Sequence, residues 1–167
     1  MQTTVDKDAA AHTMTVTTEL DASVERAWQL WADPRQLERW WGPPTYPATV
    51  VEHELAPRAT VRYFMTSPEG DKYHGMWEIV AVDPPHRLEL VDSFADDSGA
   101  KNESMPSTAM TMTLTEREGG GTTMRLHSQF ASLEAMEQLV AMGMEEGLKQ
   151  AVGQIDTILA EDPDASA

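Results

Sequence analysis

The chain has 167 residues, contains no cysteine and carries a formal net charge of -16, from 28 acidic and 12 basic side chains. This length fits one domain with a substantial core. Without cysteine, disulfides and thiolate chemistry are excluded. The negative field repels phosphate backbones and anionic lipid surfaces, so we expect neither a nucleic acid nor a membrane as partner. A solvated acidic surface accounts for the charge, although the same field would favour a cationic ligand or a basic partner.

The two ends of the chain are predicted to be disordered tails, at residues 1–11 and 162–167, flanking one domain over residues 12–161. The start lacks a basic segment followed by an apolar one, and no apolar run approaches the roughly 20 residues of a membrane span. We therefore predict a cytoplasmic protein. The alternating run at residues 13–20 (TMTVTTEL) is the first predicted strand.

Two short helices are predicted directly after this strand. Ser23 is a good N-cap, and Asp33 opens the second helix, with Pro34 at its first position and Gln36 completing a capping-box pattern. Gly42 and the prolines after it stop that helix. The first helix has apolar residues at helical spacing, which are Val24, Ala27, Trp28 and Trp31. These helices are expected to form a lid over the open end of a sheet.

The remainder of the chain alternates as antiparallel strands and then turns helical. The predicted strands cover residues 49–55, 60–66, 72–82, 87–95, 108–116 and 122–131. In the third of these both faces are apolar enough that the inward face stays open. A helical stretch follows from Ser132 to about Glu161, where Gly143 and Gly147 each weaken the helix by about 1 kcal/mol and favour a break near Met142 to Met144.

This order of elements predicts an α+β fold. A curved antiparallel sheet of about six to seven strands wraps around a long C-terminal helix, with the two short helices after the first strand. Because one amphipathic helix covers only part of such a sheet, a gap is expected between them. A gap of this kind can hold a ligand.

The chain resembles the helix-grip superfamily (START-like, birch-pollen-allergen-like) and, within it, the family of homologues of the activator of the heat-shock-protein-90 ATPase. The resemblance covers residues 13–159. It rests on the segments Ala22 to Trp31, Asp33 to Pro43, Val80 to Leu88 and Gly143 to Gly147.

Two departures from the family pattern are visible. A glycine pair is usual in the turn where this chain has Ala56 to Ala59, which should alter only turn geometry. An aromatic residue often follows the glycine equivalent to Gly147, whereas here it is Leu148. Losing that large side chain could enlarge the cavity.

The predicted cavity lining combines aromatic, methionine and aliphatic side chains from the late strands, the second short helix and the last helix. Each of these residues could equally be ordinary core filling, since methionine and tryptophan serve both purposes. One tryptophan of the pair at positions 40 and 41 is expected against the sheet and the other near the cavity mouth. The predicted lining residues are Trp40, Trp41, Tyr63, Met65, Trp77, Phe94, Met110, Met112, Leu126, Ser128, Met144, Leu148 and Val152.

Signatures of covalent catalysis are missing from the sequence. There is no nucleophile elbow, phosphate-binding loop or HExxH segment, so we assign no catalytic residue, no cofactor and no metal. His53 has carboxylates on both sides, but strand alternation sends them to the opposite face. His74, Glu78 and His127, together with Tyr63, remain an alternative acid–base set.

The sequence leaves three hypotheses for the function. The favoured hypothesis is a START-like module that binds a small hydrophobic or aromatic molecule, in preference to an enzyme. The family resemblance implies two alternatives: an interaction module acting on a chaperone, and a polyketide cyclase or aromatase, or an antibiotic-sequestering resistance protein. The chaperone partner is not favoured, because activators resembling this family carry a separate N-terminal domain for which we expect no room here. A homodimer, common among relatives, is left open.

Overall fold

An eight-stranded antiparallel sheet and five helices make up the computed structural model, which describes residues 3–161. The strands are β1 (Thr3–Asp8), β2 (Thr13–Leu20), β3 (Ala48–Glu52), β4 (Thr60–Thr66), β5 (Lys72–Asp83), β6 (Arg87–Phe94), β7 (Thr108–Glu116) and β8 (Thr122–Phe130). The helices are α1 (Val24–Ala32), α2 (Pro34–Trp40), α3 (Leu133–Ala141), α4 (Met144–Val152) and α5 (Ile155–Glu161).

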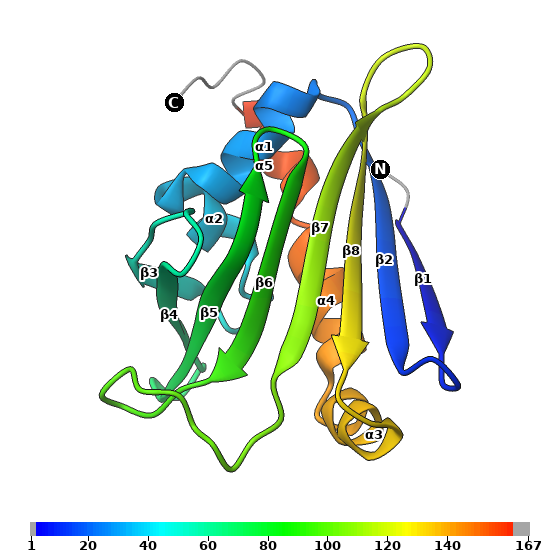
Figure 1. Cartoon of the computed structure of the whole chain (residues 1–167). Coiled ribbons are helices and arrows are strands. Elements are labelled where there is room, and N and C mark those ends of the chain that lie inside the picture. Colours follow the sequence, from blue (N-terminus) through cyan, green and yellow to red (C-terminus); the bar gives the residue numbers. More distant parts are fainter. Residues whose placement is uncertain (1–2, 162–167) are drawn as a thin grey trace.

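The strands follow the order β1-β2-β8-β7-β6-β5-β4-β3 across the sheet. Pairing of β2 with β8 joins the two ends of the chain, and every other neighbour is a hairpin partner. The sheet curls, with β1 and β3 at its edges and α4 and α5 behind its middle strands (Figure 1). This confirms the predicted α+β helix-grip architecture. None of the described helices combines the length and apolar character that a bilayer span requires.

The N-terminal segment differs from its prediction as a tail. Residues Thr3–Asp8 form β1, which pairs with β2 from Thr3 opposite Thr18 to Asp8 opposite Thr13. Its sequence, TTVDKD, has no apolar alternation and most of its residues are exposed, so backbone pairing rather than burial holds it. The sheet therefore has one strand more than the upper predicted number. The predicted tail at residues 162–167 lies outside the described residues.

The two short helices begin where the sequence predicts. Ser23 Oγ accepts a hydrogen bond from the Arg26 backbone N–H at 3.1 Å, and Asp33 Oδ1 accepts one from the Arg35 N–H at 2.9 Å. The Gln36 amide donates to the Asp33 carboxylate at 3.2 Å, so the capping-box pair meets through side chains. Gly42 is required after α2, because a Cβ there would lie 2.2 Å from the Tyr46 carbonyl oxygen.

The C-terminal helical stretch is divided into three helices. The first break falls at the predicted place, where Met142 ends α3 and Gly143 adopts a left-handed φ of 91°. The second break, between α4 and α5, was not predicted. There the Gln154 amide donates to the Gly42 carbonyl oxygen at 2.7 Å and to that of Trp40 at 3.3 Å. Through these hydrogen bonds the residue at the break contacts the end of α2. Helical periodicity cannot reveal such a contact.

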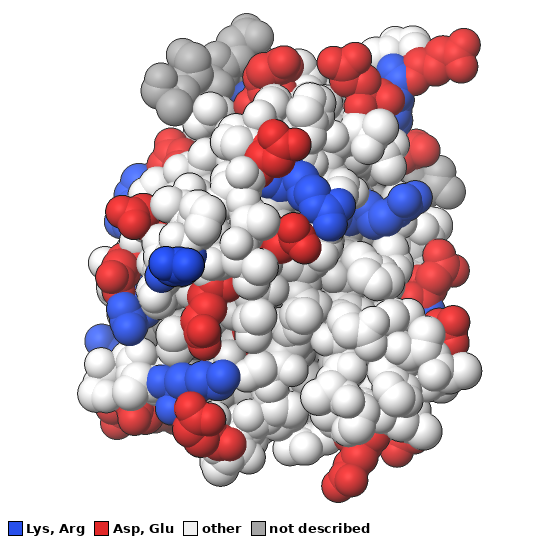
Figure 2. Space-filling model, in the orientation of Figure 1, with Lys and Arg blue, Asp and Glu red and all other residues white. Residues whose placement is uncertain are grey.

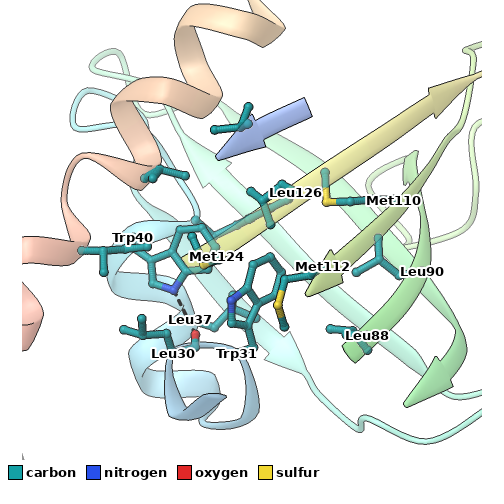
Figure 3. Close-up of a cluster of buried hydrophobic side chains, with 14 of the residues drawn as sticks. Leu30, Trp31, Leu37, Trp40, Leu88, Leu90, Met110, Met112, Met124 and Leu126 are labelled. Carbon is teal, nitrogen blue, oxygen red and sulfur yellow. Dashed lines mark hydrogen bonds between the residues drawn. The ribbon is translucent and has the colours of Figure 1, made fainter. Parts of the chain in front are cut away.

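The core fills the space between α1, α2 and the concave face of the sheet (Figure 3). Trp31 and Trp40 are both fully buried. Their rings meet edge to face with centroids 4.8 Å apart, and the Trp40 indole N–H donates to the Leu30 carbonyl oxygen at 2.9 Å. The labelled sheet residues that pack with them are Leu88, Leu90, Met110, Met112, Met124 and Leu126.

The inward face of β5, left open by the sequence, is the one that carries Trp77 and Ile79. Both side chains are buried, whereas Val80 on the opposite face is 55% exposed. Tyr63 of β4 pairs with Gly75 of β5 on the same inward face. This register decides which polar groups can reach the interior.

Candidate ligand cavity

A cavity of about 300 Å³ opens between β4–β7 on one side and α3 and α4 on the other. On the outer face of the sheet, acidic and basic side chains are interspersed (Figure 2). The cavity wall is instead mainly apolar. The predicted lining residues that do line it are Trp41, Tyr63, Met65, Phe94, Met110, Met144 and Leu148.

The remaining predicted lining residues do not border this cavity. All are fully or almost fully buried in the core, which for them corrects the prediction. They are Trp40, Trp77, Met112, Leu126, Ser128 and Val152. Strand alternation placed Met112, Leu126 and Ser128 on the correct inward face and left the face of Trp77 open, but it carries no information on the position along the strand at which packing stops. Trp40 and Trp41 accordingly divide, one in the core and one on the cavity wall.

The cavity also has borders outside the predicted set of lining residues. Several belong to loops, turns or the break between α3 and α4, where alternation gives no signal. These additional lining residues are Pro43, Tyr73, His74, Gly75, Asp92, Ser93, Pro106, Thr108, Leu139, Met142, Gly143 and Gly147.

Asp92 is the most informative of the residues that sequence reasoning missed. The Tyr63 hydroxyl donates a hydrogen bond of 2.9 Å to Asp92 Oδ1. Burial raises the pKa of Asp92 from 3.8 to about 7, and the hydrogen bond from Tyr63 opposes the rise only in part. A signal existed in the sequence, because Leu88, Leu90, Asp92 and Phe94 alternate on one face of β6. A carboxylate in such an apolar series predicts a polar group inside.

The Tyr63 hydroxyl shares this environment. Burial raises the pKa of Tyr63 well above its ordinary value of 10, the charge of Asp92 adds to the rise, and the Trp41 indole opposes it. Tyr63 therefore keeps its proton and acts as a donor to Asp92. The Trp41 and Tyr63 rings meet edge to face with centroids 6.0 Å apart, which leaves the pair of polar groups beside an aromatic wall.

Gly75 makes room for the Tyr63 ring. The two residues are directly opposite in the β4–β5 ladder, and a Cβ on Gly75 would lie 2.4 Å from the Tyr63 Cζ and Oη atoms. Such a separation is far inside van der Waals contact. The glycine therefore lets the Tyr63 ring lie flat over β5 with its hydroxyl aimed at Asp92.

The alternative acid–base set is not assembled around Tyr63. His127 Nδ1 is 2.8 Å from Thr15 Oγ1, and exposed Glu78 lies 3.8 Å from Lys101 Nζ. These contacts belong to the outer face of the sheet. His74 borders the cavity, but its ring lies 5.6 Å from that of Phe64, on the outer side.

His53 has a structural partner in place of a metal. Its Nε2 atom lies 2.9 Å from the Trp31 carbonyl oxygen. Within residues 3–161, no group of three or more histidine and carboxylate side chains is arranged to hold a metal ion.

A family model described as "Activator of Hsp90 ATPase homolog 1-like protein" matches residues 21–160. The chain belongs to this family. The match spans the two short helices, the sheet from β3 to β8 and the C-terminal helices, and so includes every wall of the cavity. None of the curated proteins matches the chain.

Several solved structures are also similar to this chain. A protein from Mycobacterium smegmatis is 47% identical, with a TM-score of 0.87 over 95% of this chain and 97% of that one. A protein from Arthrobacter aurescens is 44% identical, with a TM-score of 0.90 over 95% of this chain and 91% of that one. A protein of the dynemicin biosynthetic locus, 21% identical with a TM-score of 0.61 over 87% of this chain and 48% of its own, shares the fold alone.

Proposed function

We propose that this protein binds a small, largely apolar molecule in the cavity between the curved sheet and α4, without covalent chemistry. The observation that carries the proposal is an open volume of about 300 Å³ beside a core whose side chains are buried. This volume is at the lower end of ligand pockets, about 300–1,000 Å³, and suits a molecule of one or two rings.

The wall chemistry supports an apolar ligand. Met65, Met110 and Met144 line the cavity together with Phe94 and Leu148. Methionine side chains are unbranched and polarizable, so they adapt to ligands of different outline and contact aromatic rings favourably. Burial of apolar surface is then the main source of binding free energy.

The cavity can be tested with the neutral fluorescent probe N-phenyl-1-naphthylamine. Gly147 lies in the cavity wall, and a Cβ there would meet no atom within 4 Å. We therefore expect Gly147→Phe to fill the space and weaken probe binding by about tenfold or more, which corresponds to about 1.4 kcal/mol. The matched control is Gln150→Phe, at an exposed position of the same helix.

The proposal predicts saturable probe fluorescence in the wild type and in Gln150→Phe, with its loss in Gly147→Phe. Bound probe should also raise the melting temperature, because a ligand that binds only the folded state stabilises it. Absence of saturable binding in the wild type, or equal binding by all three proteins, would refute the cavity as the site.

Acid–base catalysis is a second candidate, favoured by the Tyr63–Asp92 pair in the cavity wall. A carboxyl group with a pKa near 7 is suited to proton transfer at neutral pH. Mass spectrometry of a ligand recovered after incubation separates the two candidates. Unchanged ligand supports binding alone, whereas conversion by the wild type and not by Asp92→Asn supports an enzyme. The chaperone and homodimer hypotheses remain predictions with no structural observation behind them.

A further inference from the structure

The Tyr63 hydroxyl and the Asp92 carboxyl group in the cavity wall favour a particular class of ligand. Resting on the proposed function, we propose that the cavity takes an apolar molecule that carries one basic nitrogen. The Asp92 carboxylate is the anionic partner of that nitrogen, and Tyr63 is a positioning residue that holds the carboxylate.

The first argument is the incomplete pairing of Asp92. Within residues 3–161, the hydrogen bond from Tyr63 to Oδ1 is the only one to this carboxylate, and no lysine, arginine or histidine forms a salt bridge with it. Other acidic side chains have such partners, as Glu145 has Lys7 at 2.6 Å. A carboxylate in an apolar wall is costly without a counter-charge. A ligand ammonium group would supply the missing charge.

The second argument is the composition of the surrounding wall. The titratable residues in the cavity lining are Tyr63, Tyr73, His74 and Asp92, and the ring of His74 lies on the outer side against Phe64. Helices α3 and α4 contribute Leu139, Met144, Gly147 and Leu148, the break between them contributes Met142, and β7 contributes Thr108 and Met110. No lysine or arginine is among these lining residues, so nothing in the wall competes with a cationic ligand for Asp92.

The third argument is the field of the whole protein. The net charge of -16 raises the concentration of small cations near the surface and lowers that of anions. An amine is drawn toward the cavity by this field and then held by one defined carboxylate. The apolar body of the ligand would meanwhile occupy the methionine-rich wall.

The test uses two ligands of the same shape, 1-naphthylmethylamine and 1-naphthylmethanol. Both carry the same apolar body, but only the amine is charged near neutral pH. At about pH 8, where Asp92 is ionised, we expect the wild type to bind the amine about ten- to a hundredfold tighter than the alcohol, the range of a hydrogen bond to a charged group. Displacement of N-phenyl-1-naphthylamine measures both affinities.

Asp92→Asn should abolish the preference for the amine while alcohol binding is retained. Asp97→Asn is the matched control, because it removes the same charge from a fully exposed side chain near the cavity rim. It should leave the preference intact. If Asp97→Asn lowers the preference as much as Asp92→Asn does, the selectivity comes from the overall field and the assignment to Asp92 fails.

The number of protons released on ligand binding is a second measurement, and it would not change if Asp92 had only a structural role. Below the pKa of Asp92, binding of the ammonium form should release up to about one proton, because the carboxyl group ionises as it pairs. Calorimetry in two buffers of different ionisation enthalpy measures this release. It should vanish in Asp92→Asn and persist in the control Asp97→Asn, which removes a fully exposed carboxylate.

Tyr63→Phe tests the positioning role, since it removes the hydroxyl and keeps the ring. We expect the amine preference to fall and the pKa inferred from proton release to rise. An unchanged preference and pKa would refute that role.

Failure of this inference is distinguishable from failure of the proposed function. If the wild type binds the alcohol as tightly as the amine, the cavity is a ligand site without a preference for a basic nitrogen, and this inference is wrong. If neither ligand displaces the probe and the probe itself does not bind, the proposed function is wrong as well.

Discussion

Strand β6 runs from a packed region of the molecule into a hollow one. Leu88 and Leu90 are buried in the core with Trp31, whereas Asp92 and Phe94, further along the same face, line the cavity. We refer to the region around Trp31, Leu88 and Leu90 as the packed end, and to the region around Asp92 and Phe94 as the open end. Both arise from one inward-facing alternation, so the strand itself does not explain the difference.

The difference comes from the helices that cover each end. The packed end is covered by α1 and α2, which contribute Trp31 and Trp40. The wall of the open end that α4 contributes contains Gly147 and Leu148 but no large aromatic residue. Since stability comes from filled space and ligand binding from unfilled space, the two ends should respond oppositely to mutation.

The largest effect is expected at the packed end. Trp31→Ala removes a fully buried ring that contacts three other tryptophans, and should lower the free energy of unfolding by about 3–5 kcal/mol. Leu148→Ala at the open end, where the side chain is only partly buried, should cost about 1 kcal/mol. Chemical denaturation of both variants measures this contrast. Equal costs would show that the two ends are packed alike.

The next effect concerns the carboxyl group at the open end. Because Asp92 has a pKa of about 7 when folded and about 3.9 when unfolded, the folded state binds more protons between these values. This contribution to the free energy of unfolding therefore falls as the pH rises from about 4 to about 7. Asp92→Asn should remove it and become more stable than the wild type above pH 7, by up to about 4 kcal/mol.

Denaturation of both proteins across the pH range measures the Asp92 contribution as a difference, so other titrating groups cancel. Parallel stability curves for wild type and Asp92→Asn would contradict the raised pKa and weaken the contrast between the two ends.

A smaller effect is expected where Tyr63 crosses Gly75. The added methyl group of Gly75→Ala would overlap the ring, which lies 2.4 Å from the Cβ position, and should cost about 1–3 kcal/mol. In a Tyr63→Leu background the overlapping ring atoms are absent, so the same substitution should cost much less. A double-mutant cycle measures this coupling. Additive costs would mean that the Tyr63 ring does not depend on the glycine.

The smallest effect is expected at Gly147, where a substitution should raise stability, in contrast to Gly75→Ala. Gly147→Ala adds a methyl group that meets no atom within 4 Å in the middle of α4. Alanine is more favourable than glycine in a helix by about 1 kcal/mol, so the variant should be more stable by up to that amount. Thermal unfolding measures it. A loss of stability would show that the space beside Gly147 is occupied.

Local patterns predicted much of the fold and only part of the cavity. The caps at Ser23 and Asp33 and the break at Gly143 follow from short-range chemistry, and the structure confirms them. The strand β1 escaped prediction because its partner, β2, supplies backbone pairing to a segment with no apolar alternation. Leu126 and Met112 were placed on the correct face but in the wrong region, since alternation gives direction and not depth.

The sequence by itself determined which residues turn inward on most strands, where most elements start and stop, and that the chain is acidic with no thiol chemistry, because these depend on nearest neighbours and composition. The tertiary structure decided where the interior remains unfilled and that Asp92 lies there beside Tyr63. That outcome depends on how far α4 stands from the sheet and on which side chains each covering helix brings. Distances of that kind are set by packing among segments far apart in the chain, and no local pattern encodes them.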